Sequence, residues 1–97
     1  MKANQQTELA ARIQAACDST EPFTKDRMKA LKAVKWTLKV AGISNDVYAL
    51  EYRSMDQKEY LTSDKSKAVV FDGRDNQDAK LAYWSAMIGE QFEICLL

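Results

Sequence analysis

The feature that most constrains this chain is the stretch from Phe23 to Ile43, whose two ends and whose periodicity all favour a helix. Thr24 can cap its start, and Gly42 stands where a left-handed residue can end a helix. At 100° per residue, the apolar side chains gather on one side and most of the basic side chains on the other. The sequence therefore predicts a helix over residues 24–41 that exposes its basic side.

The basic side of this predicted helix is a candidate binding surface, because a tryptophan lies among five lysines and an exposed ring of that size favours a partner. The predicted partner-binding residues are Lys25, Lys29, Lys32, Lys35, Trp36 and Lys39. Two other interpretations stay open. A run of charge is often only the solvated side of a helix, and Ala33 with Val40 could let Trp36 pack under the edge of a sheet.

Two further helices are expected. The first covers about Glu8 to Cys17 with Thr7 as a candidate N-cap, and the polar segment that leads to Pro22 ends it. Because the connection to the next helix is short, the first two helices should be antiparallel neighbours. The other runs from Asn76 or Gln77 to Ile88 and stops at Gly89, and its wide apolar arc indicates that Trp84 is buried.

Two of the remaining segments, residues 48–53 and 92–97, have side chains that alternate with a period of two, which is the pattern of half-buried strands. The predicted strands cover residues 48–53, 59–62, 68–71 and 92–97. Tight connections between the first three favour an antiparallel meander. The result is an α+β fold of order ααβββαβ, with the helices on one face of a four-stranded sheet.

Length and cysteine usage limit the organisation of the chain. Its 97 residues suit a single domain, 1–97, with one core. No apolar run has the length of a signal peptide or reaches the roughly 18 residues that a membrane span needs. Cys17 and Cys95 each lie in an apolar pattern, which favours reduced thiols and a cytoplasmic location, with a bridge between them as the alternative.

The net charge is zero, but the two halves differ. Residues 1–54 carry nine Lys/Arg against six Asp/Glu, and residues 55–97 carry five against eight, so the halves are +3 and −3. Overall neutrality argues against a dedicated nucleic-acid binder, which is usually strongly basic. The local balance of +5 over residues 24–42 argues in the other direction.

Catalytic chemistry has little support, and we expect neither an enzyme nor a cofactor. The chain has no histidine, neither cysteine has the surroundings of a nucleophile, and its three glycines are isolated. Asp72, Asp75 and Asp78 are spaced by three and could bind Mg²⁺, but turn formation and helix capping explain each of them without a metal. We therefore expect no metal site.

Residues 69–89, VVFDGRDNQDAKLAYWSAMIG, combine an FDGRDN turn with an aromatic pair on a helix. This segment resembles small prophage-encoded proteins of Gram-negative bacteria, including the class that contains anti-CRISPR inhibitors. The resemblance implies a non-enzymatic inhibitor that binds a host protein or ribonucleoprotein complex and blocks its nucleic-acid recognition, through the basic helix or the acidic C-terminal half. The alternative is a small protein that binds nucleic acid directly through the helix over residues 24–41, with Trp36 stacking on a base.

Overall fold

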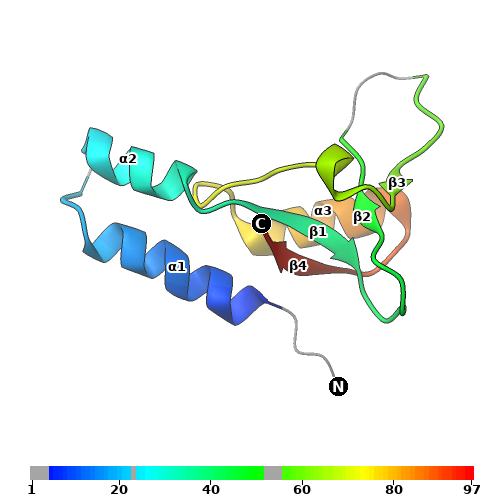
Figure 1. Cartoon of the computed structure of the whole chain (residues 1–97), viewed down its shortest axis with the longest axis horizontal. Helices are drawn as coiled ribbons and strands as arrows, with labels where there is room; N and C mark the ends of the chain where they lie inside the picture. The colour runs from blue at the N-terminus through cyan, green and yellow to red at the C-terminus, as the bar shows by residue number, and fades with distance from the viewer. Residues whose placement is uncertain (1–4, 23, 52–55) are drawn as a thin grey trace.

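A computed structural model describes residues 5–22, 24–51 and 56–97. Its elements, in chain order, are α1 (Gln6–Asp18), α2 (Lys25–Lys32), β1 (Trp36–Val40), β2 (Tyr48–Ala49), β3 (Leu61–Thr62), the 3-10 helix η1 (Lys65–Lys67), α3 (Gln77–Ile88) and β4 (Phe92–Leu96). The strands form one antiparallel sheet in the order β3-β2-β1-β4 (Figure 1). The predicted α+β class, with α-helices and a four-stranded antiparallel sheet, is confirmed for the described residues.

The predicted helix over residues 24–41 is wrong in its second half. Helix α2 ends at Lys32, and β1 occupies Trp36–Val40. The physical reason is that apolar and polar residues alternate strictly from Val34 to Val40, so this segment also satisfies the period of a strand. Its aromatic and β-branched side chains favour the extended form. Gly42, with a φ of 78°, belongs to the turn after β1 instead of ending a helix.

The other strands differ from the prediction in their extent. Strands β2 and β3 are two residues each, and β4 matches its predicted position closely. The predicted strand over residues 68–71 makes only isolated bridges, from Ala68 to Leu50 and from Phe71 to Trp36. The meander is therefore β1-β2-β3. It includes β1, a segment predicted to be helical, in place of the predicted strand over residues 68–71. Of the predicted strand over residues 48–53, Tyr52 and Arg53 lie outside the described residues.

Most helix ends follow the sequence signals. The hydroxyl of Thr24 accepts the backbone N–H of Arg27 at 3.2 Å, and the side chain of Asn76 accepts that of Ala79 at 2.9 Å. Gly89 ends α3 with a φ of 83°. Thr7 is not an N-cap, because α1 already begins at Gln6. The sequence also pairs Phe23 with Met28 as an apolar contact across the start of α2, and Phe23 lies outside the described residues.

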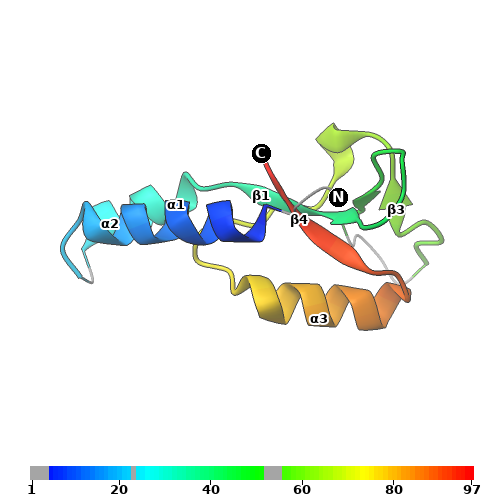
Figure 2. The same ribbon diagram turned by 90° about the horizontal axis from the view of Figure 1, so that it is seen from below.

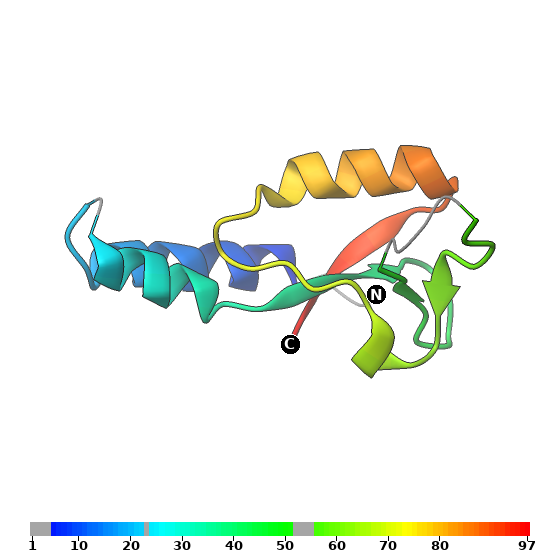
Figure 3. The same cartoon turned by 90° about the horizontal axis from the view of Figure 1, so that it is seen from above.

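The strand register separates the sheet into an apolar and a polar face. Trp36, Leu38 and Val40 of β1 lie opposite Leu96, Ile94 and Phe92 of β4 on the apolar face. The alternate pairs, Thr37 with Cys95 and Lys39 with Glu93, form the polar face. Leu9 of α1 and Trp84 of α3 join the apolar core, which confirms the prediction that Trp84 is buried. Figure 3 shows α3 on one side of the sheet and η1 on the other.

Helices α1 and α2 lie side by side and project past the sheet (Figure 2). The expectation that all helices cover one face of the sheet is wrong for α2, which contains no buried residue. The Arg27 guanidinium donates to the carbonyl oxygens of Cys17 and Thr20 at the end of α1. The N–H of Gly73 donates to the carbonyl oxygen of Leu31 at 2.9 Å. Helix α2 is thus attached by polar contacts near both of its ends.

Candidate interaction surface

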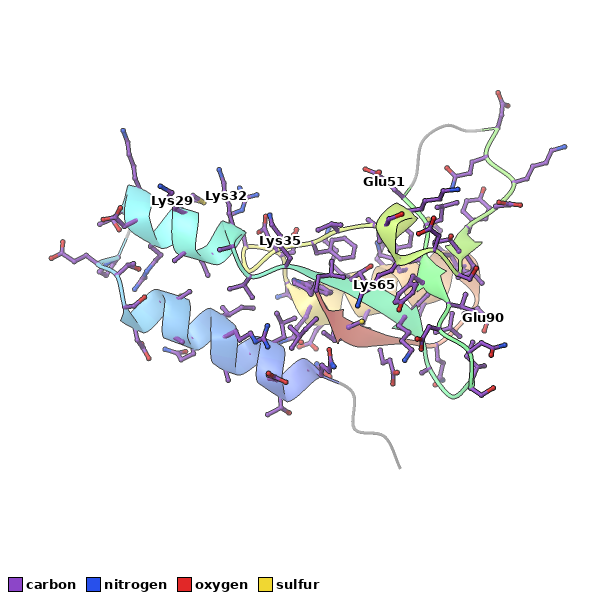
Figure 4. All side chains as sticks on the ribbon, viewed as in Figure 1. Lys29, Lys32, Lys35, Glu51, Lys65 and Glu90 are labelled. Carbon is purple, nitrogen blue, oxygen red and sulfur yellow. The ribbon has the colours of Figure 1, made fainter. Side chains whose placement is uncertain are left out.

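Four of the six predicted binding residues form one exposed basic surface. We call Lys25, Lys29, Lys32 and Lys35 the lysine face, and all four are exposed. Figure 4 shows Lys29, Lys32 and Lys35 extending from the same side of α2 and the segment that follows it. Residues 24–35 carry five basic side chains against the single acidic Asp26, a balance of +4. Within the described residues, no ion pair involves the lysine face.

Trp36 does not belong to this surface. Its exposed fraction is 0%, and its ring centroid lies 4.8 Å from that of Phe71. Its indole N–H donates to the carbonyl oxygen of Asp72 at 2.8 Å, which satisfies the polar atom of a buried ring. The prediction that Trp36 contacts a partner is wrong, because the change from helix to strand at this point turns the ring into the core. The alternative interpretation is right that Trp36 is buried, but the ring belongs to a strand inside the sheet and does not pack under its edge from a helix.

Lys39 is separated from the other lysines as well. It lies on β1, and its side chain is only 18% exposed. Its ammonium nitrogen is 2.9 Å from Asp46 and 4.0 Å from Glu93, and the hydrogen bond to Asp46 raises the pKa of Lys39. Lys39 therefore lies on the polar face of the sheet, where Asp46 and Glu93 already compensate its charge.

Two side chains, Met28 of α2 and Arg74 of the turn that precedes α3, border the lysine face. Met28 on α2 is 46% exposed, and Arg74 Nη1 lies 3.9 Å from its sulfur. Arg74 also pairs with Asp72, with 2.8 Å between Nη2 and Oδ2. This hydrogen bond holds the pKa of Asp72 down at about 2, and Lys35 acts electrostatically in the same direction. Sequence reasoning missed the contact between Arg74 and Met28, because the two residues are 46 positions apart and neither lies in a recognisable motif.

The three aspartates considered as Mg²⁺ ligands have structural contacts. Asp72 binds Arg74, and Asp75 accepts the backbone N–H of Asp72 at 2.9 Å. Asp78 accepts the side-chain amide of Gln6 on α1 at 2.8 Å. Over the described ranges, no group of three or more His, Cys, Asp or Glu side chains is placed to hold a metal ion. Turn formation and helix contacts account for all three carboxylates.

Cys17 and Cys95 are both free thiols and are partly buried. In the part of the chain that the structure describes, no helix has the length and apolar character needed to cross a membrane. Comparison of the chain with protein-family models, curated proteins and solved structures gave no match.

Proposed function

We propose that this chain is a non-enzymatic interaction protein that binds an anionic partner surface through the lysine face. The observation that carries the proposal is the combination of four exposed lysines, which form no ion pair with any described residue, with a helix that contributes no buried residue. Four like charges within one short segment repel each other, and an anionic partner would relieve that repulsion. Because α2 contributes no buried residue, its outward side chains are not committed to the core.

The partner class that fits this proposal is a host protein or ribonucleoprotein complex. The lysine face lies toward one end of the molecule, whereas Glu51 and Glu90 lie toward the other end together with Lys65 (Figure 4). Such a molecule suits a partner that presents both signs of charge. In its narrower form, the proposal is a phage or mobile-element inhibitor that occupies a host defence complex of the CRISPR type and blocks its nucleic-acid recognition. Only the resemblance of residues 69–89 supports that narrower form.

Direct nucleic-acid binding is the second candidate, and the exposed lysines favour it. Its strongest argument was a ring able to stack on a base, and the burial of Trp36 removes that argument. The remaining surface offers charge without base recognition. We expect no binding of oligonucleotides tighter than the roughly 10⁻⁶ to 10⁻⁴ M of nonspecific association at physiological salt.

The lysine face is tested with a matched pair of triple variants. In the first, Lys29→Gln, Lys32→Gln and Lys35→Gln remove three charges from the lysine face. In the control, Lys58→Gln, Lys65→Gln and Lys67→Gln remove the same charge from exposed positions elsewhere. Both should fold like the parent by circular dichroism. In nuclease-treated host lysate, tagged parent and control should retain a common partner, and the lysine-face variant should lose it.

Two outcomes contradict the proposal. Retention of the same partner by the lysine-face variant would place the contact elsewhere on the molecule. Polarisation with labelled single- and double-stranded oligonucleotides provides the other check. Direct nucleic-acid binding would replace the proposal if an oligonucleotide binds with submicromolar affinity and log K falls with log salt at a slope near −3 or steeper. Each neutralised phosphate contributes about −0.7 to −0.9 to this slope, so such a value corresponds to contacts from about four lysines.

A further inference from the structure

Strand β3 is the outermost strand at one edge of the sheet, and its register fixes where its backbone groups point. The N–H of Leu50 donates to the carbonyl oxygen of Tyr60, and Ala49 lies opposite Leu61. In an antiparallel pair, hydrogen-bonded and non-hydrogen-bonded pairs alternate, so the pair of Ala49 and Leu61 is non-hydrogen-bonded. The N–H and C=O of Leu61 therefore point away from β2, toward the outer edge.

An open hollow of about 520 Å³ lies along this edge. Leu61 and Ile88 are its apolar lining residues, and Tyr60, which is 37% exposed, also borders it. Its carboxylates are Glu59 beside β3 and Glu90 just after α3. The hollow thus combines an apolar surface, an outer strand edge and two negative charges.

The end of α3 adds a third source of negative potential to the same hollow. Helix α3 ends at Ile88, and the last carbonyl groups of a helix carry a partial negative charge. The last turn of α3 contains no basic side chain that would offset this charge. A cationic side chain placed in the hollow would interact favourably with the helix end and with both carboxylates.

We propose that the outer edge of β3 binds an extended basic segment of a partner protein by strand addition, with a Lys or Arg side chain of that segment held by Glu59 and Glu90. Backbone hydrogen bonds to Leu61 would supply the register, as in other sheet-edge complexes. The carboxylates would supply the preference for a basic sequence. This site is separate from the lysine face, which attracts the opposite charge, so either proposal can fail without the other.

The test is a titration of the isotope-labelled full chain with a capped pentapeptide of sequence Thr-Val-Arg-Val-Thr, followed by amide NMR. Peptide binding should shift the amide signals of residues 59–63, and the Leu61 amide should exchange with solvent several-fold more slowly at saturation. A peptide with Gln in place of Arg should bind more weakly. Glu59→Gln and Glu90→Gln should each weaken binding roughly two- to fivefold, the usual range for exposed ion pairs. Glu51→Gln, which removes an exposed carboxylate outside the hollow, should leave it unchanged.

Three results would overturn the inference. The first is the absence of shifts at Leu61 at millimolar peptide. The second is equal affinity for the Arg and Gln peptides, which would remove the basis for a cationic partner. The third is a second copy of the chain at this edge, which would show as a dimer in sedimentation together with slow exchange of the Leu61 amide before any peptide is added.

Discussion

Replacement of Trp36 tests the most consequential feature of the fold, the burial of this ring between the sheet and the turn before α3. Trp36→Ala removes a fully buried ring, which costs about 3–5 kcal/mol. It also leaves the buried carbonyl oxygen of Asp72 without its indole donor, at about 1–3 kcal/mol. The sum is comparable to the ~5–15 kcal/mol of a small domain, so this variant should be largely unfolded. Trp36→Phe keeps a ring beside Phe71 and should lose mainly the hydrogen bond, about 1–3 kcal/mol.

Urea unfolding followed by far-UV circular dichroism measures both variants, with an unchanged denaturant slope as the sign that only stability has changed. Tyr83→Ala is the matched control, because Tyr83 is 62% exposed on α3 and its truncation should cost less than about 1 kcal/mol. A Trp36→Ala variant within about 1 kcal/mol of the parent would refute the assigned strand, since a ring on the exposed side of a helix would cost that little.

Two further stability predictions concern the turn beside α2. The pKa of Asp72 lies at about 2, below its usual 3.8, so the ionised carboxylate stabilises the fold above about pH 4 and this contribution is lost as the pH falls toward 2. The free energy of unfolding of the parent should therefore exceed that of Asp72→Asn by less at pH 2 than at pH 4. The decrease should be at most about 2 kcal/mol, because Arg74 is partly exposed. A difference that stays constant in urea titrations from pH 7 to pH 2 would contradict this prediction. Gly73→Ala should lower the melting temperature, because its new Cβ would lie 2.8 Å from the carbonyl oxygen of Leu31. Moving α2 away from that contact should cost about 1–3 kcal/mol. An unchanged melting temperature would contradict this prediction, since it would show that the turn adapts to the Cβ without loss of stability.

The parts of the fold that could be predicted are those with a single consistent local pattern. Helix α3 combines an Asn76 cap, a left-handed Gly89 and a broad apolar surface, and all of these signals indicate the same element. Segment 34–40 is different, because the lysine spacing favours a helix and the strict alternation favours a strand. Only the pairing of β1 with β4, more than 50 positions away, decides between them. A pattern in one segment cannot contain that information.

The lysines of the candidate site could be predicted from the sequence, but the neighbouring Arg74 could not. Lys25, Lys29 and Lys32 lie on a helix as expected, because the cap at Thr24 fixes where that helix begins. Lys35 stays exposed even though it lies just beyond the helix. The position of Arg74 beside Met28 depends on the path of the chain between distant elements, and no spacing rule predicts it.

The burial of Trp36 also changes what kind of binding the lysine face can perform. A surface of four lysines with Met28 and Arg74 at its margin attracts an anionic partner over a distance and raises the association rate, and salt weakens that attraction. Among its described residues this surface has no aromatic side chain, and Arg74 already pairs with Asp72, so it offers no free anchor of the kind that usually supplies most of the affinity of an interface. Tight and selective binding would therefore need a second contact on the same partner. The hollow beside β3 has the complementary properties, an apolar lining and a strand edge that gives register. If one partner uses both surfaces, loss of either should reduce its capture strongly, whereas the pentapeptide should respond only to changes at Glu59 and Glu90.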